Sequence, residues 1–217
     1  MKGKKSNKTS REKILSGLRA GKNQHSWHAN WPESLPQGDV FPPIENLFEA
    51  FHAELSALGG EVFREEGESA LLDKLKSYAS QRGWENLVVT DDRIKEKLIH
   101  YGFSVRAFEA TDDEGFCAGV TGCEALIART GSVMVSSAGG SGRRMNVYMP
   151  VHIVWAGQSQ IVPSIEDGFF AIRNRYNEQP SQISLISGPS RTADIETTLV
   201  MGAHRPAQLI VLIDSLS

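Results

Sequence analysis

The amino-acid sequence predicts an α/β fold in which helices flank a mixed, mostly parallel β-sheet. Stretches with apolar residues three and four positions apart, typical of amphipathic helices, alternate with short apolar runs that are typical of buried strands. A β-rich insert over residues 118–144, with a turn at Thr130–Gly131, interrupts this alternation. The 217 residues suffice for one sizeable α/β domain with an appendage.

The boundaries of the expected elements follow from caps, glycine stops and apolar spacing. Helices are predicted over residues 44–58, 68–82, 91–101, 164–176 and 192–201, and strands over residues 86–90, 104–108, 149–157, 183–187 and 208–213.

Residues 1–43 are predicted to form an appendage that precedes the α/β domain of residues 44–217. A short helix is expected over residues 10–20, where Ile14 and Leu18 lie four positions apart. The rest of the appendage has no period and carries four prolines and two tryptophans. We therefore expect an irregular linker with aromatic anchors.

The charge distribution is uneven. The net charge is −3, but residues 1–22 contain eight lysines and arginines and one glutamate, so this arm is strongly basic and the remainder is acidic. No basic stripe continues into the body, so the sequence does not favour nucleic-acid binding. A solvated arm, or an arm that docks on an acidic partner, is expected instead.

The composition also narrows the location and the cofactors. No apolar run approaches the roughly 18 residues of a membrane span and no signal-peptide pattern opens the chain, so a cytoplasmic protein is expected. Cys117 and Cys123 are the only cysteines. Two cysteines without a second pair do not indicate a zinc site or an iron–sulfur cluster, so we expect no metal and no cofactor in this chain.

The stretch "SGPSRTADIE" is more elaborate than a connector needs. Ser190, Arg191 and Thr192 place two hydroxyls and a guanidinium at the start of a predicted helix, whose first backbone N–H groups are unpaired. The stretch also follows a predicted strand, and ligands in parallel sheets settle beyond the carboxyl ends of strands. A site for a small carboxylate is therefore predicted. The alternative is a turn whose polar side chains bind no ligand.

Glu124 and His152 are further candidates for the functional site, although each could instead have a purely structural role. Glu124, in "TGCEAL", is the best-placed carboxylate for covalent or acid–base chemistry, although a structural hydrogen-bonding role is more common. His152 alternates with apolar neighbours in "PVHIVW", a pattern typical of a core histidine. The glycine-rich "SSAGGSGRR" matches no nucleotide-binding pattern, but its glycines allow a ligand to approach closely.

These residues carry a family resemblance. The runs "TGCEALIARTGSVMVSS", "MPVHIVWAGQSQIVPSIEDG" and "ISGPSRTADIETTLVMGAHRPAQLIVLID" resemble the lactate-utilisation protein C family (LutC/YkgG), whose members contain a LUD domain. The resemblance is strong and ordered from about Gly119 to Asp214. It implies a fold similar to the sugar-isomerase and CoA-transferase (NagB/RpiA-like) group.

The resemblance also implies a role. The chain would be the non-redox subunit of an assembly that oxidises L-lactate to pyruvate, alongside iron–sulfur partner proteins, and would bind a small carboxylate or cofactor at the 188–196 turn. The family provides no assigned catalytic residue, so Glu124 stays a candidate. The family-like positions that we take as ligand-binding candidates are Thr121, Arg144, His152, Gly188, Ser190, Arg191, Thr192, Asp194 and Glu196.

Two other functions remain open at this point. One is a free-standing enzyme of the CoA-transferase or sugar-phosphate-isomerase kind that uses Glu124 as nucleophile or base. The other is a regulatory or scaffolding module that docks through its basic arm. The sequence does not decide the oligomeric state, and a homodimer is compatible with it.

Overall fold

The structure is a computed structural model of the chain, which falls into two units, Met1–Pro42 and Pro43–Ser217. It describes residues 9–22, 41–84, 86–106, 118–138, 145–192, 200–201 and 206–217. In the first unit, helix α1 (Ser10–Lys22) leaves the side chains of Ile14 and Leu18 exposed. Within the described ranges, no helix is both long enough and apolar enough to cross a membrane.

The second unit is built on a six-stranded sheet in which every neighbouring pair of strands is parallel. In order across the sheet the strands are β1 (Glu61–Glu65), β12 (Gln208–Asp214), β7 (Val151–Gly157), β4 (Ala118–Thr121), β2 (Leu87–Val89) and β3 (Val105–Arg106). The central strands are almost continuously apolar because both faces of the sheet are covered.

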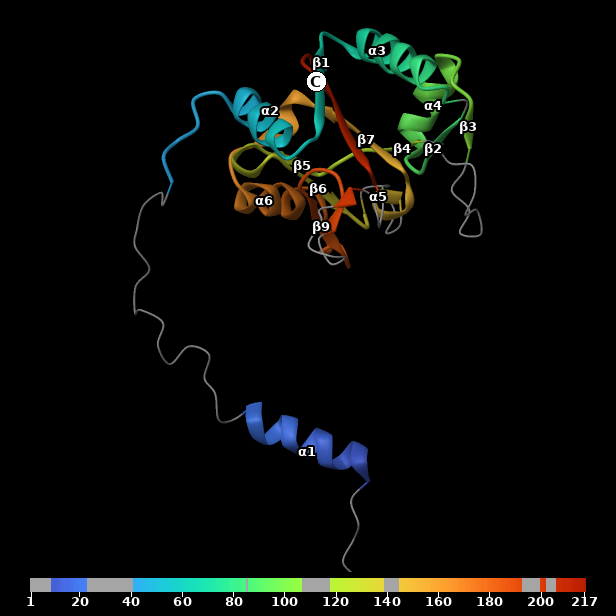
Figure 1. The fold of residues 1–217 in the computed structure, drawn as a ribbon. Helices are drawn as coiled ribbons and strands as arrows, with labels where there is room; N and C mark the ends of the chain where they lie inside the picture. The colour runs from blue at the N-terminus through green and yellow to red at the C-terminus, as the bar shows by residue number, and fades with distance from the viewer. Residues whose placement is uncertain are drawn as a thin grey trace, which may run out of the picture. The chain divides into compact units, whose positions relative to one another are not determined.

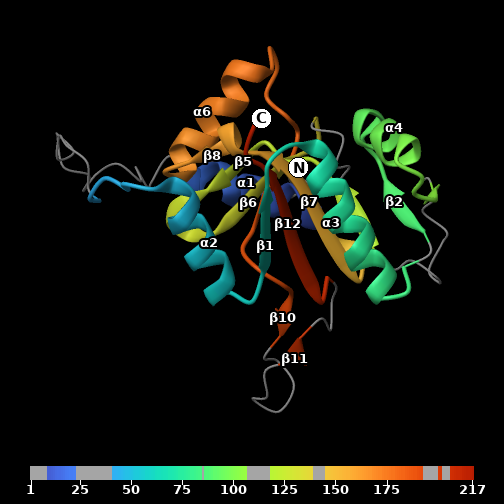
Figure 2. The same ribbon diagram turned by 90° about the horizontal axis from the view of Figure 1, so that it is seen from above.

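Two helices, α3 (Glu68–Gln81) and α4 (Asp92–His100), cover one face of this sheet (Figure 2). Their buried leucines and isoleucine pack against residues of β2, β4, β7 and β12 in one apolar cluster. Helix α4 begins where it does because Oδ1 of Asp91 accepts hydrogen bonds from the backbone amides of Arg93 and Ile94.

A second, four-stranded sheet covers the other face (Figure 1). Its strands, in order, are β8 (Ile161–Val162), β5 (Ala125–Ile127), β6 (Ser132–Ser136) and β9 (Ile183–Ile186). Helix α2 (Leu47–Ala57) packs beside this sheet, and α6 (Ile165–Arg175) packs against the face that is turned away from the main sheet. The unit is therefore layered as helices, parallel sheet, second sheet and helix.

Gly131 connects this second sheet to α2. It follows the short 3-10 helix η1 (Ala128–Thr130) in the turn between β5 and β6, with a φ of 56°. A Cβ atom here would lie 2.3 Å from the backbone nitrogen of Leu55 in α2. Only glycine meets both requirements, the left-handed conformation and the close approach of another backbone.

The predicted fold class is confirmed, and the predicted turn at Thr130–Gly131 joins β5 and β6, which pair in antiparallel register. Several elements differ. Residues 44–46 are not helical, because Asn46 caps the helix and it begins at Leu47. Strand β4 belongs to the main sheet rather than to the insert, whereas β9 belongs to the second sheet. Strand β1 was not predicted, because its sequence "EVFRE" is rich in charge and the strand lies at the sheet edge. The short helix α5 (Met145–Tyr148) was not predicted either.

The predicted helix over residues 192–201 is wrong at both ends. Strands β10 (Arg191–Thr192) and β11 (Val200–Met201) pair with each other in antiparallel register. An extended backbone at Thr192 removes the expected helix start beside Arg191. Residues 193–199, which include the candidates Asp194 and Glu196, lie outside the described residues.

Candidate functional site

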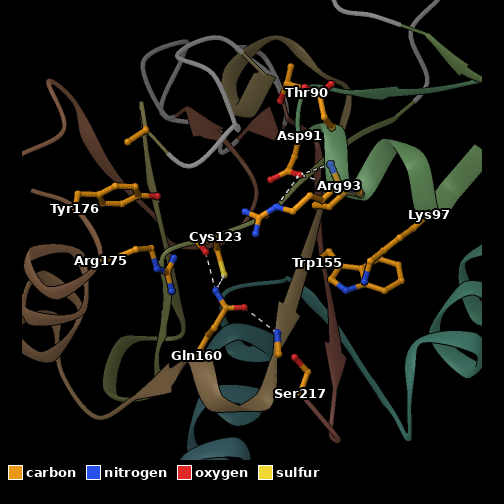
Figure 3. Close-up of a pocket in the computed structure, with 15 residues that line it drawn as sticks. Thr90, Asp91, Arg93, Lys97, Cys123, Trp155, Gln160, Arg175, Tyr176 and Ser217 are labelled. Carbon is orange, nitrogen blue, oxygen red and sulfur yellow. Dashed lines mark hydrogen bonds and ion pairs between the residues drawn. The ribbon is translucent and has the colours of Figure 1, made fainter.

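A pocket of about 890 Å³ lies at the carboxyl-terminal edge of the parallel sheet (Figure 3). It is bordered by the segments that follow β2 and β4 and by the ends of β7 and α6. Its lining residues are Thr90, Asp91, Asp92, Arg93, Ile94, Lys97, Gly122, Cys123, Ala138, Trp155, Gly157, Gln160, Arg175, Tyr176 and Ser217. A volume of this size is typical of sites for small molecules and cofactors.

The position of the pocket follows from the topology. Strands β2 and β4 are neighbours. After β2 the chain re-enters this sheet at β3, on the sheet edge, whereas after β4 it passes through the second sheet and re-enters at β7, toward the sheet centre. The two connections therefore separate beyond the carboxyl ends of these strands. In open parallel sheets such a switch point is the usual place for a ligand.

Arg175 and Tyr176, at the end of α6, form one side of the pocket. Nη1 of Arg175 donates a 2.7 Å hydrogen bond to Oε2 of Glu124, and the Tyr176 hydroxyl lies 3.0 Å from Oε1. The side chain of Arg175 is 44% exposed, whereas that of Glu124 is almost fully buried. Glu124 thus holds the guanidinium at the pocket without lining the pocket itself.

The Glu124 carboxylate is also held from the second sheet. The Ser136 hydroxyl donates to Oε1 at 2.5 Å, and the backbone amide of Glu124 donates to the carbonyl of Met134 at 2.7 Å. A buried carboxylate needs such partners, because an unpaired charge in the interior is costly. Burial, followed by the nearby negative charge of Glu124, raises the pKa of Tyr176, so its hydroxyl stays protonated and donates to Glu124.

Gln160 braces the loop after β4. Its Oε1 accepts from the amide of Gly157 at 2.9 Å, and its Nε2 donates to the carbonyl of Cys123 at 2.7 Å. Burial, then the charge of Glu124, raises the pKa of the Cys123 thiol to about 12. Cys123 therefore remains a thiol at neutral pH and is a poor nucleophile.

Helix α4 forms the opposite side of the pocket. Figure 3 shows Arg93, Lys97 and Trp155 on this side, across from Arg175 and Tyr176. Nζ of Lys97 is paired with Glu68 of α3, and the Arg93 side chain is 91% exposed. The pocket therefore has cations on both sides.

Thr121 and His152 lie inside the fold rather than at the pocket. Both are fully buried, and Oγ1 of Thr121 is 2.8 Å from Nε2 of His152, which links β4 to β7. Burial lowers the pKa of His152 to about 4, so its ring is neutral at physiological pH. The structure gives this histidine the core position that is typical of its pattern, and a ligand role for either residue stays a prediction.

The "SGPSRT" turn lies at the opposite edge of the main sheet. The amide of Ser190 donates to the carbonyl of Pro206, shortly before β12 begins, and the guanidinium of Arg191 donates to the carbonyl of Leu58, shortly before β1. The turn does follow the carboxyl end of β9, as the sequence predicted. However, β9 pairs antiparallel with β6 in the second sheet, so its end points to the amino edge of the parallel sheet.

The structure therefore separates the predicted site residues. Glu124 lies behind the pocket, Thr121 and His152 lie in the core, and Gly188, Ser190 and Arg191 lie in the turn. The side chain of Thr192 and all of Arg144 are outside the described residues. Among the residues that are described, no three His, Cys, Asp or Glu side chains are grouped as a metal site would require.

Sequence reasoning missed the residues that line the pocket. A signal was present for two segments, because Thr90–Asp91 and Gly157 stand at the carboxyl ends of strands that were predicted. Arg175 and Tyr176 had no such signal. They reach the pocket only because the end of α6 is packed against the second sheet, an arrangement that local patterns do not reveal.

Comparisons with known proteins fit this architecture. The family model described as LUD domain matches residues 113–213. A solved DUF162 family protein from Deinococcus radiodurans has a similar fold, with a TM-score of 0.61 and 18% identity over 78% of this chain and 96% of that one. The chain thus has the fold of an α/β protein with a LUD domain, which confirms the resemblance.

The curated relatives are more specific. Lactate utilization protein C of Bacillus pumilus is 28% identical over 89% of this chain and 85% of that protein. The protein of the same name from a Geobacillus species is 26% identical over 94% of this chain and 96% of its own length. An uncharacterized Neisseria meningitidis protein is 37% identical, but the match spans only 41% of that protein. Together with the domain match, these relatives show that the chain is similar to lactate utilization protein C over most of its length.

Proposed function

We propose that the protein acts in lactate utilization as the non-redox, ligand-binding subunit of an assembly that oxidises L-lactate to pyruvate. The observation that carries this proposal is the similarity to proteins named lactate utilization protein C, which extends over 85% and 96% of the two relatives' lengths. The similarity spans 89% and 94% of this chain, so it covers most of the α/β unit.

The proposed ligand is a small carboxylate, bound at Arg175. An arginine can grip a carboxylate with two parallel N–H groups, and its planar fork loses little freedom when it is already held in place. Glu124 keeps the guanidinium in place by accepting a hydrogen bond from Nη1 of Arg175. The exposed part of the Arg175 side chain borders the pocket. Lactate and pyruvate both carry one carboxylate, so the same contact would serve substrate and product.

The redox chemistry is proposed to reside on partner proteins. Oxidation of lactate to pyruvate releases two electrons and two protons, which an electron acceptor must take. An iron–sulfur cluster normally uses four cysteine ligands, and the sequence contains two cysteines. We therefore propose that iron–sulfur clusters are held by other subunits and that this chain positions or senses the acid.

A ligand role for the 188–196 turn stays a prediction. Part of the turn has a structural role, because Arg191 donates to the carbonyl of Leu58 and Ser190 donates to the carbonyl of Pro206. These contacts do not account for the whole "SGPSRTADIE" stretch, since its last residues lie outside the described part of the chain. Arg191 and Arg175 variants therefore have to be compared.

The proposal is tested by affinity purification of the tagged full chain from its host under anaerobic conditions. We expect iron–sulfur proteins to co-purify and the eluate to reduce a dye when L-lactate is added. We further expect Arg175→Met to abolish lactate-dependent reduction while the partners still co-purify. Arg173→Met, on the same helix but outside the pocket lining, serves as the matched control.

The contrary result is equally specific. If the chain is purified without redox partners, and lactate elicits no dye reduction, the subunit role is wrong. A free-standing enzyme that uses Glu124 would then be the function to test, by assaying the isolated chain on CoA thioesters and sugar phosphates.

A further inference from the structure

We infer that the pocket also binds a nucleoside phosphate, with the phosphate against Lys97 and Arg93 of α4 and the planar base against Trp155. The inference deepens the function proposed above and rests on this pocket being the functional site. It assigns a ligand class to the side of the pocket that faces Arg175 and Tyr176.

The pocket is larger than a three-carbon acid needs. Pockets of roughly 300–1,000 Å³ enclose ligands the size of drugs or cofactors. A pocket of about 890 Å³ is near the upper end of that range, and a three-carbon acid held at Arg175 fills only a small part of it. The remaining space is bordered by α4 and Trp155, so these residues define what else fits.

Helix α4 brings two cationic side chains to the pocket. Lys97 is 44% exposed and Arg93 is almost fully exposed, so both can turn toward an anion. The acidic groups nearby are partly engaged with the same helix. Oδ1 of Asp91 accepts two backbone amides and lies 3.9 Å from Nε of Arg93, and Glu68 pairs with Lys97, so a phosphate would compete with these carboxylates for the two cations. Asp92 adds one exposed negative charge. A lysine and an arginine on one helix suit a phosphate, which accepts several charge-assisted hydrogen bonds.

An aromatic ring and a hydroxyl without a hydrogen-bond partner among the described residues also border the pocket. Trp155 is half-buried at the end of β7, where it packs against the apolar core under α3 and α4 and also borders the pocket. A ring held in this way presents a fixed flat surface on which a base can stack. Oγ1 of Thr90, another lining residue, is buried and has no hydrogen-bond partner within the described ranges.

The test uses calorimetric titration of the full chain with ADP. We expect saturable binding, weakened about tenfold or more by Lys97→Met, because a charge-assisted hydrogen bond to the phosphate is lost. Trp155→Leu should weaken it as well, whereas Trp155→Phe should retain part of the affinity. Lys95→Met is the matched control, since Lys95 belongs to the same helix but does not line the pocket.

Adenosine lacks the phosphates and pyrophosphate lacks the base, so titrating each of them tests the base contact and the phosphate contact separately. Both are expected to bind more weakly than ADP. Absence of saturable ADP binding would overturn the inference, as would ADP binding unchanged in both Lys97→Met and Trp155→Leu, or pyrophosphate binding as tight as ADP. Thermal unfolding of each variant checks that it is folded.

The inference and the proposed function fail separately. Arg175→Met is expected to lose pyruvate binding and to keep ADP binding. If wild-type protein binds pyruvate but not ADP, only the nucleoside-phosphate inference is wrong.

Discussion

The guanidinium of Arg175 is tied to the carboxylate of Glu124 by a 2.7 Å hydrogen bond that joins the end of α6 to the loop after β4. The carboxylate is buried and the guanidinium is 44% exposed, so the negative end of this ion pair lies inside the fold and the positive end lies at the pocket. This arrangement assigns Glu124 the role of positioning a cation at the pocket.

Replacing Glu124 by glutamine is expected to destabilise the fold and weaken ligand binding together. Ser136, Tyr176 and Arg175 all donate to this carboxylate, and an amide replaces one acceptor oxygen with a donor. The buried mismatch should cost about 1–3 kcal/mol in free energy of unfolding, measured with urea. Titration with pyruvate should show reduced affinity because Arg175 loses its hold.

A different result for Glu124→Gln would point to chemistry. If the free energy of unfolding is unchanged while an activity of the isolated chain disappears, Glu124 acts as a nucleophile or base and the positioning role is wrong. Ser136→Ala removes one donor and leaves the carboxylate in place, so it provides the comparison for stability alone.

Replacing Arg191 by alanine distinguishes a structural turn from a ligand site. The guanidinium donates to the carbonyl of Leu58, and the side chain is exposed, so we expect a loss of about 1 kcal/mol in stability. Pyruvate affinity should not change, since the turn and the pocket lie at opposite edges of the sheet. Lost binding with an unchanged melting temperature would instead support the ligand role that the sequence suggested.

Replacing Gly188 by alanine is expected to destabilise the turn more than Arg191→Ala does. Its φ is 85°, a conformation that side chains rarely adopt, and an added Cβ would lie 2.8 Å from the Leu58 carbonyl oxygen. The strain and the contact should together cost about 1–3 kcal/mol, visible as a lower melting temperature. A melting temperature equal to that of wild type would mean that the turn does not need glycine.

His152 makes stability depend on pH in the acidic range. Burial lowers its pKa from 6.5 to about 4 in the folded state, so between these values the unfolded chain binds the proton more readily. Stability from this residue is therefore complete above pH 6.5, falls as the pH drops, and is fully lost below pH 4. The loss should be on the order of 3 kcal/mol.

The measurement is urea unfolding at several pH values between 7 and 4, on wild type and on His152→Gln. Glutamine does not titrate. Its side-chain amide places a polar atom near the position of Nε2 of His152, the atom that contacts Thr121. The variant should have a flatter pH profile. Identical profiles would show that His152 is not the source of the acid sensitivity.

The fold was predictable from sequence because the spacing of apolar residues indicates which side of a helix or strand is buried. Caps such as Asp91 and Ser164 and the apolar strands "LVV" and "VHIVWAG" were recognisable locally. What escaped prediction depends on tertiary placement. The sequence does not reveal that β9 joins the second sheet, and that choice moves the "SGPSRT" turn to the amino edge.

The pocket was predictable only in part for the same reason. Thr90–Asp91 follows a recognisable strand and is placed by the carboxyl-end rule. Arg175 reaches the site through the packing of α6 on Met134 and Ile127, including the close approach at Gly168. The sequence singled out Glu124, which contacts Arg175 at the pocket, but neither the sequence nor the family resemblance indicated which edge of the sheet holds the pocket.

Pyruvate titration of wild type, Arg175→Met and Arg173→Met tests the central claim most directly. Calorimetry on the full chain should give saturable binding for wild type and for Arg173→Met. Arg175→Met should lose about tenfold or more in affinity, the equivalent of one charge-assisted contact. It should also melt at a lower temperature, because the buried Glu124 carboxylate loses its cation, so binding is compared well below that temperature. Equal affinity in all three proteins would contradict the assignment of the carboxylate site to this pocket.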